Sequence, residues 1–211
     1  MQIWAPIFLS LWVSAAATLL GTLAGVSAAA VLALGVFPGR GVLVVAVNAL
    51  LGLPPVVVGL VFYLLLSHSG PLGDLGLLFT PTAMVLAQAA LAAPIICALV
   101  HRSLEHSWAE FGPPLRVLGA TRLRALPVLL GMSRRAVATA ILAGFGRCLS
   151  EVGAVLIVGG NILGHTRSLT TSIVLQTAMG NLDTSLLLGL VLVGVSVAVS
   201  AGGIALGGAR L

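Results

Sequence analysis

HRSLEHSWAEFGPPLRVLGATRLRALPVLLGMSRR (residues 101–135) is a polar segment between two long apolar stretches, and it carries six of the ten arginines of the chain. A helix needs roughly 20 apolar residues to cross a hydrocarbon core about 30 Å thick. The apolar stretches on both sides reach that length. The segment therefore predicts an extramembrane loop between two membrane-spanning helices.

The composition of the 211 residues points to the same class of protein. They are 59% hydrophobic and 7% charged, with a mean hydropathy of +1.20. That leaves too little polar surface for a soluble domain. We expect a single all-α, polytopic membrane domain over 1–211 with about five transmembrane helices. The predicted spans are 6–36, 42–66, 82–100, 136–160 and 185–206.

The arginines predict how the chain is oriented, because short loops rich in Lys or Arg stay cytoplasmic. With the loop 101–135 inside, five spans put the N-terminus outside and the C-terminus in the cytoplasm. Arg40 and Arg210 then also lie inside, and Arg167 lies outside. The external loops are 67–81 and 161–184. The net charge of +5 thus reflects topology, and nucleic-acid binding is excluded because no basic stripe with interleaved aromatic residues is present.

Two features of the spans concern helix geometry. Pro54 and Pro55 remove intrahelical hydrogen bonds inside the second span, so a kink or an interruption is expected there. It is either a packing bend or a hinge that lines a cavity. Gly21 and Gly25 in the first span predict close helix packing. The same is expected for the glycines of the last span, which are Gly189, Gly194, Gly202, Gly203 and Gly207.

Arg147 and Glu151 are opposite charges within one span. Their i, i+4 spacing places them on one helical face as a pair. Ionisable groups at membrane depth usually face a bundle interior or a watery cavity. The pair is therefore either a structural unit that neutralises itself or a part of an anion pathway.

The loop 101–135 is too long for a simple turn and predicts a helix, a break and a second helix. We expect a helix over 101–108, a restart at Pro113 and Pro114, and an interruption at Gly119. The second part of the loop is amphipathic, with an apolar side and a charged side. Such an element suits docking to a partner or an interfacial helix on anionic lipid. These sides consist of Leu115, Leu118, Leu123 and Leu126, and of Arg116, Arg122 and Arg124.

The stretch LRVLGATRLRALPVLL (115–130) resembles the cytoplasmic EAA loop of the membrane subunits of ABC importers. That loop follows the pattern E-A-A, three residues, Gly, nine residues, I-x-L-P. Gly119 takes the glycine position and Leu129 the isoleucine position. The E-A-A positions hold Pro113, Pro114 and Leu115, and the final L-P positions hold Gly131 and Met132.

A second segment narrows the resemblance. CLSEVGAVLIVGGNILGHTRSLTTSI (148–173), together with the arginine at 147, resembles a span and external loop of molybdate, sulfate and especially tungstate permeases. LPPVVVG (53–59) and GPLG (70–73) fit the same oxyanion-permease pattern in the same order. The resemblance covers the chain from about the second span to the fifth.

The resemblance implies a type I ABC-importer permease in a prokaryotic cell membrane. It implies a homodimer, two cytoplasmic ATPase subunits and an extracytoplasmic oxyanion-binding protein as partners. A P-loop requires a lysine that reaches the nucleotide phosphates, and this chain contains no lysine. We therefore expect it to bind no cofactor, with Mg-ATP on the ATPase. The implied ATPase-coupling residues are Pro114, Leu115, Arg116, Leu118, Gly119, Ala120 and Arg122.

For a transported dianion, neutral donors are the preferred ligands, because the anion must be held weakly enough to leave. The candidates along the pathway are Arg147, Ser150, Glu151, Asn161, Thr166, Thr170 and Thr171. Most hydroxyl and amide side chains of this kind cap helices or stabilise loops, so each is also a structural candidate.

Two other functions compete with this interpretation. A membrane-embedded metal enzyme could use His101 and Glu105, which share a helical face, but His106 points elsewhere. A secondary transporter driven by an ion gradient predicts an internal repeat and several intramembrane carboxylates. Only Glu151 is present within a span, and no repeat is found.

Overall fold

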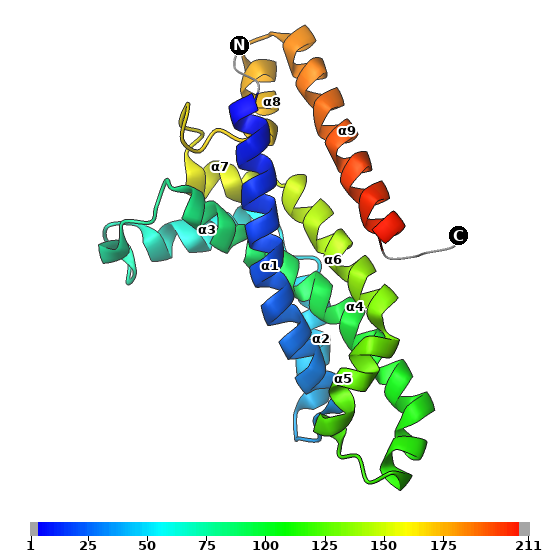
Figure 1. Cartoon of the computed structure of the whole chain (residues 1–211). Coiled ribbons are helices and arrows are strands. Elements are labelled where there is room, and N and C mark those ends of the chain that lie inside the picture. The colour runs from blue at the N-terminus through cyan, green and yellow to red at the C-terminus, as the bar shows by residue number, and fades with distance from the viewer. Residues whose placement is uncertain (1–3, 207–211) are drawn as a thin grey trace.

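A computed structural model describes residues 4–206 of the chain, in which helices are joined by turns and loops and no β-strand occurs (Figure 1). The all-α prediction is confirmed. Arg210 and Gly207 lie outside the described residues. The elements are α1 (Trp4–Leu34), α2 (Arg40–Leu50), α3 (Pro55–Leu66), the 3₁₀ turn η1 (Gly73–Leu75), α4 (Pro81–Val117), α5 (Arg122–Met132), α6 (Arg134–Leu149), α7 (Gly153–Gly159), α8 (Leu169–Ala178) and α9 (Leu182–Leu206).

The helices agree with about five predicted spans. Three of them, α1, α4 and α9, are each long and apolar enough to cross a membrane. Two bent pairs bring the number up to five if each pair forms one span: α2 with α3, bent by 103°, and α5 with α6, bent by 75°. Which terminus faces the cytoplasm stays a prediction from the arginines.

The expected interruption at Pro54 and Pro55 is confirmed. The helix α2 ends at Leu50, Pro54 has an extended backbone with φ −64° and ψ 125°, and Pro55 is the first residue of α3. Proline suits that position because the N–H it lacks has no partner in a first helical turn. The second predicted span is therefore two helices at a steep angle.

The helix α4 is longer than predicted. It runs past Val100 and through both prolines to Val117, so the predicted restart at Pro113 is wrong. The prolines leave two helical carbonyls, those of Ala109 and Glu110, without an N–H partner. Both residues are exposed, so water can satisfy these carbonyls and the helix continues.

The fourth predicted span, 136–160, is wrong as one uninterrupted helix. The helix α6 ends at Leu149, and α7 begins at Gly153. Hydropathy continues across this break, but the Glu151 carboxylate accepts a hydrogen bond from the N–H of Ala154, which starts a new helix. The predicted external loop 161–184 also contains a helix, α8, whose start is fixed by a capping box between Ser168 and Thr171.

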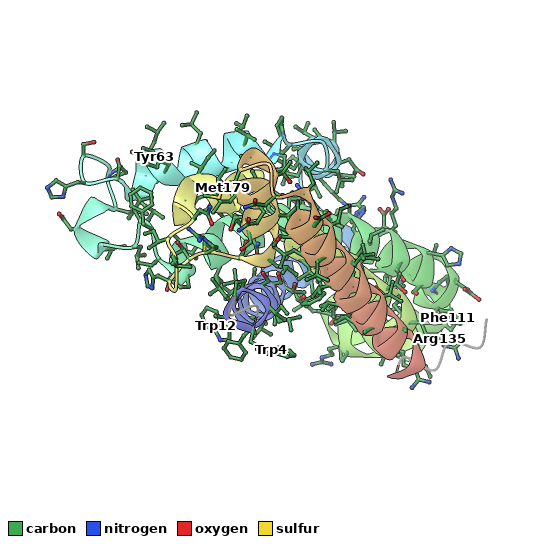
Figure 2. The ribbon with its side chains drawn as sticks, turned by 90° about the horizontal axis from the view of Figure 1, so that it is seen from above. Trp4, Trp12, Tyr63, Phe111, Arg135 and Met179 are labelled. Atoms are coloured by element: carbon green, nitrogen blue, oxygen red, sulfur yellow. The ribbon has the colours of Figure 1, made fainter. Side chains whose placement is uncertain are left out.

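The core consists of α1, α4 and α6 side by side, and α1 contacts α4 most extensively. Glycines on α1 allow this approach, as predicted. A Cβ on Gly25 would lie 2.8 Å from the carbonyl oxygen of Ala93, and one on Gly21 would lie 3.1 Å from the Cβ of Ala92. In the view from above, Trp4 and Trp12 point away from this core (Figure 2).

The helix α9 is different, because it contacts the rest of the chain mainly through α8 and α6. The expectation of close packing at Gly189, Gly194 and Gly202 is wrong within one chain, since a Cβ at each would meet nothing within 4 Å. Gly203 does approach α6, at Leu142. Gly194 and Gly202 are exposed and Gly189 is half-buried, and α9 runs along one side of the molecule (Figure 1).

Replacing Gly25 with leucine is expected to lower the free energy of unfolding by about 1–3 kcal/mol, because the added side chain forces α1 away from α4. Ala24→Leu is the matched control, since Ala24 is exposed on the same helix. Thermal unfolding of both variants in detergent measures the difference. Equal melting temperatures for the two variants would contradict the close α1–α4 packing.

Candidate functional site

The turn between α4 and α5 lies at the end of the molecule opposite α8 (Figure 1). The N–H of Gly119 donates to the carbonyl of Arg116, and the N–H of Ala120 donates to the carbonyl of Leu115, both at 2.9 Å. With Gly119 at φ +78°, this is a Schellman motif. Only glycine adopts that backbone conformation without strain, so Gly119 is the break that was predicted.

Three large apolar side chains form an exposed tip on this turn: Val117, Leu118 and Leu123 are 88%, 81% and 83% exposed. The other two leucines of the predicted apolar side, Leu115 and Leu126, instead pack against the core. Of the remaining predicted coupling residues, Pro114 and Arg116 are exposed and Ala120 is half-buried. The tip is thus an exposed apolar surface on a turn that is rich in arginine.

The guanidinium of Arg122 points into the protein and contacts two other helices. Its guanidinium carbon lies 5.3 Å from the ring centroid of Trp108, and its Nη1 donates to the carbonyl of Leu34 at 3.2 Å. Arg116 stacks on the same ring at 5.5 Å. The sequence contains no local signal for this contact, because residues 34, 108 and 122 meet only in the fold.

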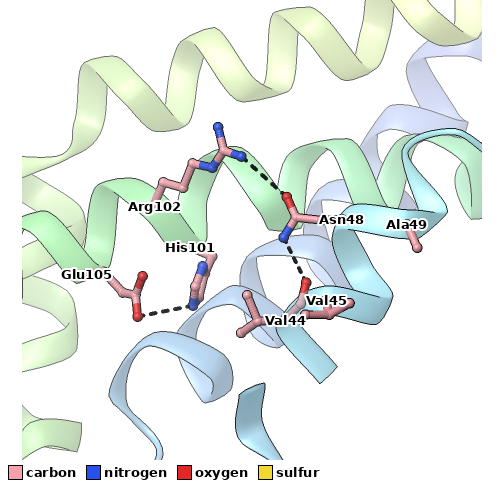
Figure 3. Close-up of a pocket in the computed structure, with 7 residues that line it drawn as sticks. All are labelled: Val44, Val45, Asn48, Ala49, His101, Arg102 and Glu105. Carbon is pink, nitrogen blue, oxygen red and sulfur yellow. Dashed lines mark hydrogen bonds and ion pairs between the residues drawn. The ribbon is translucent and has the colours of Figure 1, made fainter. Parts of the chain in front are cut away.

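A cavity of about 600 Å³ lies between α2 and α4 near the same end (Figure 3). His101 Nε2 lies 3.6 Å from Glu105 Oε1, and Arg102 donates to Asn48 at 3.4 Å. The Glu105 carboxylate also pairs with Arg40, whose Nε donates to the carbonyl of Leu32. The Glu105 carboxylate is therefore already paired with an arginine. Residues 4–206 hold no cluster of three His, Cys, Asp or Glu side chains that could bind a metal.

Arg147 and Glu151 form the predicted pair at the break between α6 and α7. Arg147 Nη1 lies 2.5 Å from Glu151 Oε2, and the two side chains are 28% and 2% exposed. Glu151 Oε1 accepts from the N–H of Ala154 at 3.0 Å. Thr170 donates to the backbone carbonyl of Glu151 at 2.9 Å. The buried carboxylate thus neutralises Arg147 and accepts from an N–H in the first turn of α7, and Thr170 ties α8 to the backbone of the break.

The structure brings this break together with the break at Pro54 and Pro55. A Cβ on Gly59 of α3 would lie 2.7 Å from the Cα of Ala154, and one on Gly153 would lie 2.8 Å from Val56 Cγ2. The start of α3 therefore lies directly beside the start of α7. Two features that were predicted separately form one junction of broken helices.

The predicted neutral donors differ in their exposure and in the hydrogen bonds that they already make. Ser150 is exposed, and its hydroxyl donates only to the carbonyl of Arg147, at 3.3 Å. Asn161 accepts a hydrogen bond from Arg167 Nε at 3.3 Å. The three threonines, by contrast, are buried, and their hydroxyls bond internally. These are Thr166, Thr170 and Thr171.

Several buried polar residues that support this junction were missed. Ser10 accepts from the N–H of Leu169 at 2.8 Å and so ties α1 to α8. Gln88 donates to the carbonyl of Cys148 at 3.0 Å and ties α4 to α6. Ser10, Ser14 and Thr18 recur every four residues, which is a signal in the sequence for a buried polar strip; all three are buried.

Comparison with known proteins identifies relatives along most of the chain. The permease protein of the tungstate uptake system of Peptoclostridium acidaminophilum is 38% identical over 206 residues, which cover 95% of this chain and 88% of the relative. The corresponding protein of Campylobacter jejuni is 37% identical over 70% of this chain and 62% of its own.

The molybdenum transport system permease of Escherichia coli is 31% identical over 84% of this chain and 82% of its own. A scan against protein-family profiles finds no match. The identity and coverage of these relatives, together with the helical fold, show that the chain belongs to the ABC oxyanion permease family.

Proposed function

We propose that the chain forms the pathway of an ATP-driven importer for a tetrahedral oxyanion, with tungstate as the preferred cargo and molybdate as the alternative. As a permease of this family, it is a multi-pass protein of the cell membrane, and a separate subunit hydrolyses the ATP. The names of two relatives support tungstate. The chain itself binds no cofactor in this proposal.

The junction of broken helices is the observation that carries the proposal. The N-terminus of α3 has a positive partial charge, and it lies beside the pair of Arg147 and Glu151. Discontinuous helices with N-termini that face anionic groups occur at transporter binding sites. The N-terminus of α3 attracts an anion in this proposal. Because Glu151 already neutralises Arg147, the anion is held weakly enough to leave. Arg147 and Ser150 are the accessible ligands in this proposal.

The exposed tip supports a docking role for the α4–α5 turn. Three apolar side chains that project from a membrane protein on a charged turn suit a cleft on a partner. We assign this tip to the ATPase, so that closure of the ATPase pair moves the helices between inward-open and outward-open arrangements. The extracytoplasmic binding protein then meets the opposite end of the bundle.

A second copy of the chain completes the pathway in this proposal. No residue of α2 is buried, and α3 and α9 present apolar side chains outward, among them Val57, Leu60, Leu186 and Leu190. Exposed apolar surface of this kind is covered either by lipid or by protein. A homodimer covers part of it and places the junctions of two copies around one pathway.

ATP hydrolysis by the complete complex tests the cargo. Permease, ATPase and binding protein are reconstituted in vesicles, and hydrolysis is measured with tungstate, molybdate or sulfate. Tungstate is expected to stimulate hydrolysis at the lowest concentration, with molybdate next. Stimulation by sulfate alone, or by none of the three, would contradict the assignment.

Uptake into the same vesicles separates this function from a gradient-driven transporter. ATP-dependent uptake is expected to survive dissipation of the ion gradients and to stop when ATP is withdrawn. The opposite pattern would identify a secondary transporter.

A further inference from the structure

Two arginine side chains lie over the ring of Trp108, on the part of α4 that leads to the tip. The guanidinium carbons of Arg116 and Arg122 are 5.5 Å and 5.3 Å from its ring centroid, within the range of a cation–π interaction. Gly112, one turn further along α4, makes room for the ring. A Cβ there would lie 3.0 Å from Trp108 Cδ2.

Arg122 connects this ring to a third helix. Its Nη1 donates to the carbonyl of Leu34, the last residue of α1. The last carbonyls of a helix have no intrahelical partner, and a positive charge there is favourable. Arg122 is the first residue of α5, so one side chain touches α1 and α4 from the start of α5.

No carboxylate competes for these arginines. The ion pairs formed within residues 4–206 involve Arg40, His101, His106 and Arg147, and none involves Arg116 or Arg122. The ring of Trp108 and the carbonyl of Leu34 therefore determine where the Arg122 guanidinium lies. Because Arg122 is the first residue of α5, this contact fixes the start of α5, and with it Leu123, against α1 and α4.

We propose that Trp108, Arg122 and the carbonyl of Leu34 form a joint that makes the tip move together with α1 and α4. Arg122 is then a positioning residue for energy coupling, and it does not contact the ATPase. The inference rests on the proposed docking of the ATPase at the tip. Force applied at Leu118 reaches the core through this joint as well as along the backbone of α4.

The experiment compares variants of the permease in the complete complex. The variants are Trp108→Ala, Arg122→Gln and their double variant, with Trp108→Phe as the conservative change. Arg124→Gln is the matched control, because Arg124 is an exposed arginine two residues further along α5 and does not stack on Trp108. Co-purification of the ATPase, the rate of ATP hydrolysis and the uptake of tungstate are measured for each.

Trp108→Ala and Arg122→Gln are expected to retain the ATPase and its hydrolysis, while the uptake per ATP hydrolysed falls about tenfold. The double variant is expected to lose no more than either single variant, because both remove the same contact. Trp108→Phe, which keeps an aromatic face, is expected to retain most of the coupling, and Arg124→Gln all of it. Rescue by phenylalanine separates the joint from a general loss of folding.

Normal uptake per ATP in Arg122→Gln would overturn the inference, as would an equal loss in Arg124→Gln or loss of the ATPase from Arg122→Gln. Leu118→Asp tests the proposed docking separately, because it places a charge on the tip and leaves the joint intact. If Leu118→Asp retains the ATPase, the docking proposal fails. If it releases the ATPase while Arg122→Gln couples normally, only the joint is refuted.

Discussion

Replacing Glu151 with alanine is expected to lower the stability of the permease by about 3–5 kcal/mol and to abolish transport, because it leaves a partly buried arginine without its counter-charge. The variant also removes the acceptor for the N–H of Ala154. The break between α6 and α7 then loses both interactions of the carboxylate. Thermal unfolding in detergent and uptake in vesicles measure the two effects.

Glu110→Ala is the matched control for this variant. Glu110 is an exposed carboxylate on α4 at 3.9 Å from His106, and exposed pairs contribute little to stability. Equal melting temperatures for the two alanine variants would show that the stability of the fold does not depend on Glu151 as the counter-charge of Arg147. Removing both charges with Arg147→Met and Glu151→Met is expected to restore much of the stability but not the transport, since Arg147 is a proposed ligand of the cargo.

The spans and the Arg147–Glu151 pair could be predicted from the sequence because they depend on local composition and spacing. Hydropathy marks where apolar residues run long enough to cross a membrane, and Pro54 and Pro55 remove helical hydrogen bonds inside one such run, which predicts an interruption there. The i, i+4 spacing of Arg147 and Glu151 fixes their relation as long as the intervening residues are close to helical. These features needed no knowledge of the rest of the fold.

The helix breaks and continuations that were predicted wrongly depend on which partners the backbone N–H and carbonyl groups find for their hydrogen bonds. Pro113 and Pro114 leave α4 intact because the carbonyls they free are exposed. The apolar residues on both sides of Ser150 gave no sign of the break there, which depends on the bond from Ala154 to Glu151. Hydropathy carries no information on either kind of hydrogen bond.

The role of Arg122 could not be predicted either, for a different reason. On a helical wheel it belongs to the charged side of a loop, together with Arg116 and Arg124. Its contacts, however, are to Trp108 and to the end of α1, and these residues meet only once α1, α4 and α5 are packed. A sequence pattern places a residue on a face of one helix, but a tertiary contact decides whether that residue is free.

Replacing Gly119 with valine is expected to abolish transport while the permease stays folded. A β-branched residue at φ +78° is a strong outlier, and a left-handed residue other than glycine costs about 1–2 kcal/mol. A Cβ at Gly119 would meet nothing within 4 Å, so the core is not disturbed. The turn relieves the strain by changing its backbone, which moves Leu118 away from its position on the tip.

Two control variants isolate the backbone of this turn as the cause. Gly131→Val adds the same side chain to a glycine of α5 that also has open space around it, and it is expected to transport normally. Gly119→Asn is expected to retain most of the uptake, because asparagine tolerates the left-handed conformation. Uptake in vesicles, with ATPase co-purification alongside, measures all three variants. Normal uptake by Gly119→Val would refute the coupling role of the turn, whereas loss in both Gly119 variants would point to the added side chain and away from the backbone.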